Sequence, residues 1–477
     1  MNTIQRIAKN TVALLVAQFV TAISGLVLSI FIARNLGDAI FGKYSFALAF
    51  VAIFAVFSDL GYNTLIIREV ARDRSKASKY LNNVLCMRVI LSLVIFALIV
   101  MTVNLMSYPA DTKNVVYLFG IYTLLNSISA VFTVTFRAFE KMEYETIIII
   151  FVNIIRLSLV LFVLFLGYGL IELAHIFVLS GALEVLLSIL VCRKEFVRPR
   201  IEFDFKFWTS TIMMAIPFSI VTLFSLIYIR IDTLMLSMMK GDEVVGWYNA
   251  AYGLILAFKP IPQLFMNALF PLMSNYFKSS KESLYEIYEV SLKYLFILGL
   301  PLTAGITLLA DKFIYLFYGQ QFENSIVALQ ILALDILIFF LFQPLVFIAL
   351  AINKERQRAV LAGAGALLNV ILNLYLIPNY SYVGAAIATI ITETTLIALY
   401  FAIISESFYR IEICKLFIKP LIATLVMSIF IYYAINRFGL ILTICLAVGL
   451  YFLVLVITKC ITNREIQIFE KVITKKV

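Results

Sequence analysis

Nine ionisable side chains interrupt the long apolar stretches of this chain, and they are its most informative residues for chemistry. Placing a charged side chain at the centre of a bilayer costs roughly 2.5–3.5 kcal/mol on insertion scales, so a charge kept there normally faces water, a ligand or a partner. The set comprises Arg88, Arg156, Arg230, Lys259, Asp59, Glu184, Asp232, Asp335 and Glu393. These residues predict a polar passage inside an apolar bundle.

The four basic members of the set are spread over the depth of the predicted bilayer. At 1.5 Å per residue, Arg156, Lys259, Arg230 and Arg88 lie about 15, 21, 12 and 9 Å inside their helices. Guanidinium groups bind phosphate oxygens in bidentate fashion, so such a ladder of positive charge favours a diphosphate as ligand. The structural alternative is internal pairing: Arg230 with Asp232 or Glu393, and Lys259 with Asp59.

Two of the carboxylates are candidates for ion coupling. Asp335 and Glu393 each lie about 15 Å from the external face in the predicted helices. Burial favours the protonated form of a carboxyl group, and the same oxygens suit sodium, so the coupling ion is H⁺ or Na⁺. The five cysteines show no metal-ligand spacing, and we expect no cofactor and no metal.

The composition places these residues in a membrane protein. Hydrophobic residues make up 63% of the chain and charged residues 14%, and the mean hydropathy is +1.02. A soluble domain is nearer half apolar and a quarter charged. The net charge of +10 is dispersed over short loops rather than gathered on one domain, so we expect no nucleic-acid partner. Phosphate-binding glycine loops and Ser/His/Asp groupings are absent, so we expect no catalytic residues.

Apolar runs between charged or turn-rich breaks predict an all-α fold of about fourteen membrane-spanning helices. The expected spans are residues 11–33, 43–67, 82–107, 114–136, 146–168, 170–192, 209–238, 245–275, 290–310, 325–351, 359–377, 383–405, 417–436 and 439–458.

Lysine and arginine give the orientation. Of the 38 basic residues, the predicted external loops hold only Arg34, Lys43, Lys113, Lys240, Lys312 and Arg437. Basic residues are retained on the cytoplasmic side of a membrane, so we expect a multi-pass protein of the cytoplasmic membrane with both termini inside the cell.

An internal repeat divides the chain. Residues 36–50 match residues 240–254 at two glycines, an aspartate, a tyrosine and an alanine. Both copies lie between the first and second helices of a half, which predicts two pseudo-symmetric six-helix lobes. The expected division is an N-terminal lobe at 1–192, a cytoplasmic linker at 193–207, a C-terminal lobe at 208–407, and a final helix pair with a cytoplasmic tail at 408–477.

Several segments carry a family resemblance. They are IARNLGDAIFGKYSFALAF at 32–50, SDLGYNTLIIREVARD at 58–73, IRIDTLMLSMMKGDEVVGWYNAAYGL at 229–254, the Phe270–Pro271 pair and VGAAIATIITE at 383–393. In this order they resemble the polysaccharide transporters of the multidrug/oligosaccharidyl-lipid/polysaccharide (MOP) exporter superfamily, which includes the Wzx O-antigen flippases.

The resemblance implies a secondary-active flippase that alternates between inward-open and outward-open forms. Similar proteins pass an oligosaccharide linked to undecaprenyl diphosphate, or to a dolichyl carrier in archaea, through a cationic cavity. It implies Arg230, Asp232 and Asp59 as residues of that cavity, beside Arg156, Lys259 and Arg88. Membrane lipid and the lipid-linked oligosaccharide are the expected partners, and a complex with a glycan polymerase or ligase is compatible with them. Five acidic groups against four basic ones are a departure from a purely cationic cavity.

Other functions are left open by the sequence. Within the same fold these are a lipid II flippase and a MATE-type drug or cation antiporter, although the helix pair at 417–458 disfavours the antiporter. From other classes, a membrane glycan polymerase or glycosyltransferase would need a sizeable external loop, and the external loops here are short. A purely structural scaffold does not explain nine buried ionisable groups.

Overall fold

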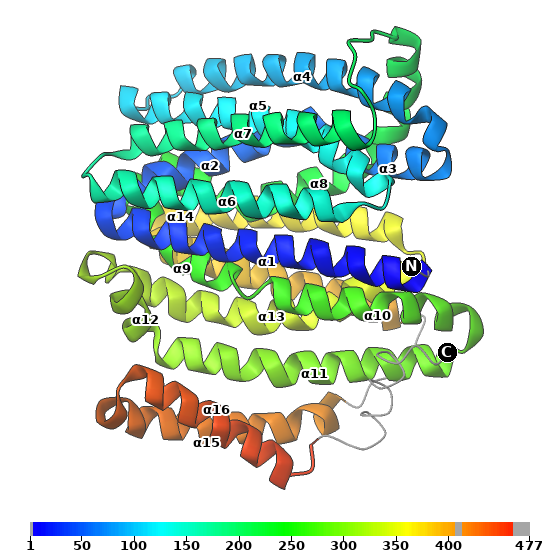
Figure 1. Cartoon of the computed structure of the whole chain (residues 1–477). Coiled ribbons are helices and arrows are strands. Elements are labelled where there is room, and N and C mark those ends of the chain that lie inside the picture. Colours follow the sequence, from blue (N-terminus) through cyan, green and yellow to red (C-terminus); the bar gives the residue numbers. More distant parts are fainter. Residues whose placement is uncertain (1–2, 406–412, 461–477) are drawn as a thin grey trace. The chain divides into compact units, whose positions relative to one another are not determined.

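The computed structural model describes residues 3–405 and 413–460, and helices make up most of them (Figure 1). No strand occurs among the described residues. The helices are α1 Thr3–Leu36, α2 Asp38–Asp59, α3 Tyr62–Arg72, η1 Arg74–Lys76, α4 Ala77–Leu105, α5 Ala110–Ala138, α6 Met142–Phe165, α7 Leu170–Glu195, α8 Phe205–Lys240, α9 Asp242–Leu256, α10 Pro260–Ser279, α11 Lys281–Leu308, α12 Ala310–Phe317, η2 Gln320–Phe322, α13 Ser325–Ala351, α14 Glu355–Ser405, α15 Ile413–Phe438 and α16 Leu440–Ile457.

The helices confirm the prediction of an all-α, multi-pass membrane fold. Thirteen helical segments of the described chain are long and apolar enough to cross a bilayer. The longest, in α14, contains Ser381 with non-helical backbone angles, φ 55° and ψ −137°. This break separates the spans predicted at 359–377 and 383–405, so each of the predicted spans falls on a helical segment of the structure.

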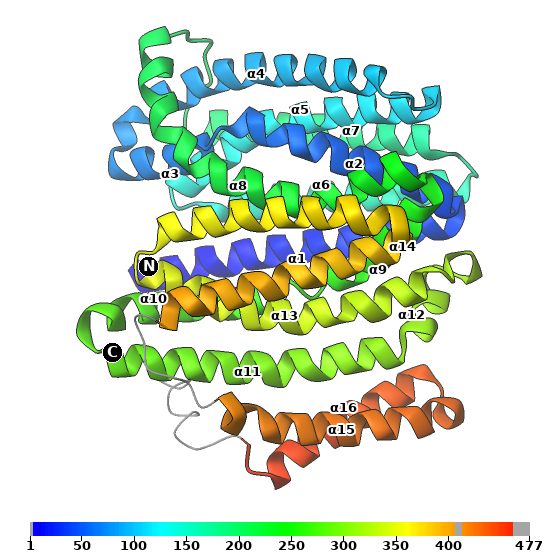
Figure 2. The same ribbon diagram turned by 180° about the vertical axis from the view of Figure 1, so that it is seen from behind.

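The chain forms two compact units, residues 1–249 and 250–477. In the first unit α5 packs along α7 and α4, and α6 packs on α1 (Figures 1 and 2). In the second, α13 packs against α11 and α14, and α15 pairs with α16. Helix α8 packs along α2 within the first unit, so this unit extends past the predicted linker at 193–207. The four predicted domain ranges stay predictions.

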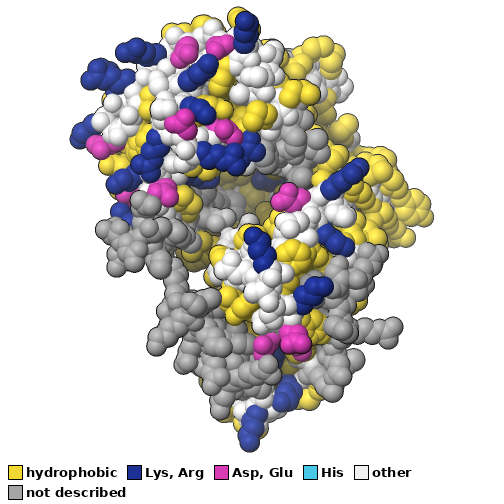
Figure 3. All heavy atoms as spheres, turned by 90° about the vertical axis from the view of Figure 1, so that its right-hand side faces the viewer, with side chains coloured by type: hydrophobic (Ala, Val, Ile, Leu, Met, Phe, Trp, Pro, Cys, Tyr) yellow, Lys and Arg dark blue, Asp and Glu magenta, His cyan; other side chains and the backbone are white. Residues whose placement is uncertain are grey.

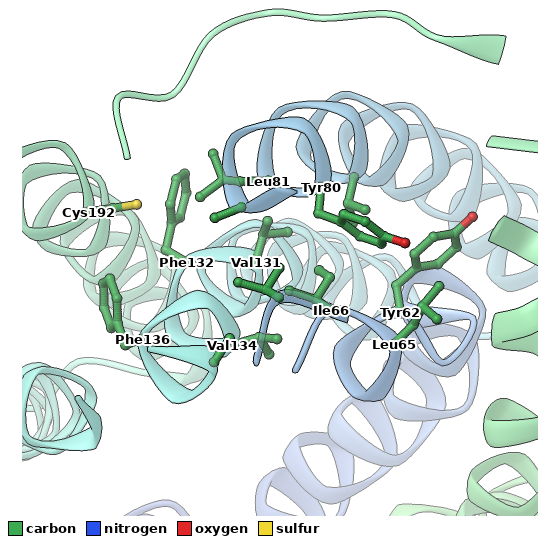
Figure 4. Packing of buried hydrophobic residues seen from close by; sticks show 14 of the residues in the cluster. Tyr62, Leu65, Ile66, Tyr80, Leu81, Val131, Phe132, Val134, Phe136 and Cys192 are labelled. Atoms are coloured by element: carbon green, nitrogen blue, oxygen red, sulfur yellow. The ribbon is translucent and has the colours of Figure 1, made fainter. Parts of the chain in front are cut away.

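A core of large apolar side chains fixes one end of α3, α4, α5 and α7 in the first unit (Figure 4). Leu65, Ile66, Leu81, Phe132 and Phe136 are fully buried there. Close packing of such side chains leaves neighbouring residues little freedom to move. The core therefore holds in place the helices that also carry polar side chains.

Basic side chains gather beside this core, on the face of the first unit formed by α3, η1 and the start of α4 (Figure 3). Arg72, Arg74, Lys76 and Lys79 are each more than half exposed there. The sequence predicts that these residues lie on the cytoplasmic side, where basic residues are retained.

The two copies of the internal repeat touch each other within the first unit. The second residue of each copy is a glycine at positive φ, Gly37 at 88° and Gly241 at 92°, and it directly precedes α2 or α9. A Cβ atom on Gly42 would lie 1.8 Å from the carbonyl oxygen of Asp242, and one on Gly246 would lie 2.1 Å from that of Asp38. Only glycine permits this reciprocal approach of the two helix starts.

Candidate functional site

Arg88 lies at the centre of a polar cluster in the first unit. Its side chain is 1% exposed and forms an ion pair with Asp59. It also donates hydrogen bonds to the Asn63 side-chain oxygen and the Ser127 carbonyl oxygen, each at 3.1 Å. These contacts join α4 to the end of α2, to α3 and to α5, so the charge of Arg88 is balanced inside the bundle.

The backbone between α2 and α3 positions the acidic partner. Leu60 and Gly61 both take left-handed angles, with φ of 46° and 81°, which end α2 directly after Asp59. The Asp59 carboxylate then accepts the backbone N–H of Asn63 at 3.1 Å as α3 begins. The helix break therefore aims Asp59 and Asn63 at the same guanidinium group.

These residues line a cavity of about 380 Å³ within the first unit. One wall is a face of α2 with apolar side chains at helical spacing: Leu48, Val51, Ala52 and Ala55. A second wall comes from α5: Tyr122, Thr123, Asn126, Ser127 and Ala130. Arg88 and Arg230 both reach the cavity, Arg230 from α8. The cavity thus combines two cations, one carboxylate, amides and hydroxyls with an apolar wall.

Arg156 lies behind the α5 wall and is not among the residues that line the cavity. Its guanidinium carbon is 5.2 Å from the ring centre of Tyr122 and 5.3 Å from that of Phe177. Its Nε donates to the Ser180 hydroxyl at 2.9 Å. Cation–π contacts of this kind stabilise a desolvated guanidinium group.

Asp232, two residues after Arg230 on α8, is 4% exposed and accepts a hydrogen bond from the Tyr248 hydroxyl at 2.7 Å. It is absent from the cavity lining. Of the six residues predicted to bind substrate, the structure brings Arg88, Asp59 and Arg230 to one cavity. Arg156 and Asp232 lie near it in the same unit.

The sixth predicted residue, Lys259, lies in a separate cluster in the second unit. Its Nζ is 2.9 Å from Asp335 and 3.4 Å from Glu393, and it lies 4.7 Å from the ring centre of Phe339. The Asp335 side chain is fully buried and that of Glu393 is 6% exposed. Lys259, directly before α10, thus shares its charge with one carboxylate of α13 and one of α14. The internal pairing suggested for Lys259 from the sequence was with Asp59, whereas in the structure Lys259 pairs with Asp335 and Glu393 and Asp59 pairs with Arg88.

The prediction from ionisable residues missed the α5 wall. Tyr122, Thr123 and Asn126 carry no charge, and nothing distinguishes them from the many other polar and aromatic residues of the helices. The available signal was their spacing at i, i+1 and i+4, which puts them on one side of a helix.

Two family profiles and a relative of known sequence match this chain. The profile of the family described as polysaccharide biosynthesis protein matches residues 7–277, and that of the MatE family matches residues 217–375. A protein of Shigella flexneri named "Putative O-antigen transporter" is 23% identical over 374 residues, which cover 75% of this chain and 88% of the relative.

Solved structures show the same fold. The lipid II flippase MurJ in an inward closed conformation superposes with a TM-score of 0.77 at 16% identity, covering 93% of this chain and 97% of the other. A multidrug resistance MATE family transporter of the MOP superfamily gives 0.66 at 16% identity, covering 83% and 98%. The chain therefore belongs to the polysaccharide biosynthesis protein family, and its multi-pass membrane fold is that of transporters of the MOP superfamily.

Proposed function

We propose that this transporter is a flippase that moves an oligosaccharide linked to a polyprenyl diphosphate across the cytoplasmic membrane by alternating access. The observation that carries the proposal is the cavity of the first unit, where Arg88 and Arg230 lie together among apolar helices. A diphosphate matches two guanidinium groups in charge and in hydrogen-bonding geometry. The name of the Shigella relative supports the same class of cargo.

The ion pair of Arg88 with Asp59 gives the cavity a way to bind and release an anion. A diphosphate that approaches Arg88 competes with Asp59 for the same guanidinium group, because both are oxygen anions. Exchange between the two keeps the buried arginine paired throughout, which avoids the several kcal/mol that an unpaired buried charge costs. Arg230 provides a second cation in the same cavity.

The proposed transport is secondary-active, and its coupling ion binds at the Lys259 cluster. Two carboxylates, Asp335 and Glu393, share one lysine, so the fully ionised cluster carries one excess negative charge. One proton or one sodium ion neutralises that charge. The protein lies in the cytoplasmic membrane with both termini in the cytoplasm, as the distribution of basic residues favours.

The experiment is deletion of the gene followed by analysis of lipid-linked oligosaccharide in spheroplasts. Without the protein, the oligosaccharide is expected to accumulate and to resist a membrane-impermeant oxidant added outside. Wild-type chain should restore oxidation, and Arg230→Ala should not. The matched control is Arg437→Ala, because Arg437 is an exposed arginine at the end of α15. Accumulation of lipid II instead of a lipid-linked oligosaccharide would show that the chain is a lipid II flippase.

Coupling is tested in proteoliposomes that contain the purified protein. Dissipation of the proton gradient with a protonophore, or replacement of sodium by choline, should identify the ion. Asp335→Asn should then abolish accumulation against a gradient while leaving downhill exchange of the cargo. Unchanged uphill transport by Asp335→Asn and by Glu393→Gln would rule out the cluster as the coupling site.

A further inference from the structure

The α5 wall of the cavity has a composition suited to sugars rather than to phosphate. Tyr122, Asn126 and Ala130 follow at i, i+4 and i+8, and Thr123 and Ser127 run beside them at i and i+4. Residues at these spacings lie on one side of a helix. An aromatic ring, an amide and hydroxyls are therefore presented together along one helix to the space that contains the two arginines.

The Tyr122 ring is held in place from behind. The Arg156 guanidinium group lies over the ring at 5.2 Å, and Phe177 contacts it edge-to-face at 5.4 Å with an interplanar angle of 84°. Arg156 is itself fixed by Ser180 and is only 9% exposed. Tyr122 lines the cavity and Arg156 does not, so the ring separates the guanidinium group from the cavity. A ring fixed in this way loses little conformational freedom when a ligand binds.

A pyranose ring offers the complementary surface. Its axial C–H groups form an apolar face that stacks on an aromatic ring, and its equatorial hydroxyls donate to and accept from amide and hydroxyl groups. The α2 part of the lining is apolar at Leu48, Val51, Ala52 and Ala55, ends in the polar residues Ser58 and Asp59, and contains no aromatic ring. Among the residues that line the cavity, those of α5 therefore combine an aromatic ring with an amide and hydroxyls, the two kinds of contact that a sugar makes.

We propose that Tyr122, Thr123 and Asn126 form a monosaccharide subsite that binds the sugar attached directly to the diphosphate, with Tyr122 as the stacking platform. Arg156 is the positioning residue of this platform. The proposal rests on the flippase function and deepens it, because it divides the cavity into a diphosphate part at Arg88 and Arg230 and a sugar part on α5. Selectivity for the first sugar is then set by α5, independently of the charges.

The test measures equilibrium binding to the purified full-length protein in detergent. The probes are farnesyl diphosphate and farnesyl diphosphate bearing one hexose on its terminal phosphate. The wild-type protein should bind the sugar-bearing probe more tightly. Tyr122→Leu should weaken that binding about tenfold, equivalent to ~1.4 kcal/mol, and leave the sugar-free probe within about twofold. Tyr122→Phe keeps the ring and should match the wild type with both probes.

Two further variants, and the ratio of the affinities for the two probes, distinguish a loss of sugar binding from a loss of folded protein. Asn126→Ala should also weaken only the sugar-bearing probe, whereas Arg230→Ala should weaken both. The ratio of the two affinities is the readout, and a misfolded fraction does not change it. A ratio in Tyr122→Leu and Asn126→Ala equal to that of the wild type overturns the sugar subsite. Equal binding of both probes by the wild type overturns it too and leaves diphosphate recognition standing, whereas no binding of either probe removes the proposed function itself.

Discussion

At the scale of single residues, Arg88 has a structural role in its contacts and a proposed role in binding the cargo. Arg88 is buried, is paired with the partly exposed Asp59, and contacts α3 and α5 through Asn63 and Ser127. Arg88→Ala leaves the partly exposed carboxylate of Asp59 in the cavity without its partner, and solvent keeps the cost below the roughly 3–5 kcal/mol of breaking a fully buried pair. We expect a lower unfolding temperature in detergent and less protein in the membrane.

The double variant Arg88→Ala/Asp59→Asn separates the two roles. It removes both charges, so it should recover part of the lost unfolding temperature while transport stays absent. The two substitutions touch the same contact, and their effects should therefore be non-additive. Additive losses of stability would mean that the ion pair contributes nothing in the folded protein.

Asp204, outside the membrane spans, links stability to pH. The backbone N–H of Phe207 donates to its carboxylate at the start of α8, and Lys79 lies 3.1 Å away, so the pKa of Asp204 is lowered. This stabilisation is present above the unfolded-state pKa of about 3.9 and is lost as pH falls through the folded-state value. Asp204→Ala should lower the unfolding temperature at pH 7, with a gap that narrows towards pH 3. Asp204→Asn, which retains a capping group, should lose less; a gap that is constant with pH would contradict the argument.

Whether a residue of the candidate site could be predicted from the sequence depends on whether its side chain is charged. The cost of burying charge identified Arg88, Asp59, Arg230 and Lys259 from sequence, because ionisable groups stand out in apolar helices. Their partners could not be foreseen, since the Leu60–Gly61 break and the packing of separate helices decide which carboxylate meets which cation. The α5 wall was missed because uncharged residues in a helix give no comparable signal.

At the scale of elements, the structure explains why both copies of the internal repeat contain glycines at matching positions. The two starts of α2 and α9 approach so closely that Gly42 and Gly246 each face a backbone carbonyl of the other copy. Trp247 adds a hydrogen bond at 2.7 Å to the Asp38 carboxylate. The spacing of Gly, Asp and Gly was visible in the sequence, but the contact between the copies depends on how the chain folds back.

Gly246→Ala should separate the two helix starts, because the carbonyl group that a new methyl would meet belongs to the backbone. Overpacking of this kind costs about 1–3 kcal/mol. Trp247 reports on it, since only two tryptophans are present and Trp208→Phe leaves one. We expect a lower unfolding temperature and a changed Trp247 emission. Gly25→Ala is the matched control, because a Cβ there meets nothing within 4 Å. Equal effects of the two variants would exclude close approach as the cause.

At the scale of the whole molecule, the helix count and the positive charges together predict the membrane topology. The basic segment between α3 and α4 is expected in the cytoplasm and the turn before α13 outside. In a variant without native cysteines, Gln320→Cys should react with an impermeant maleimide in intact cells, and Ser75→Cys only after permeabilisation. Both positions are exposed, so access depends on the side of the membrane. The reverse pattern would invert the orientation, and reaction of both in intact cells would mean an error of one helix between them. Because the flipping direction depends on this orientation, the same labelling determines whether the cargo starts on the cytoplasmic face.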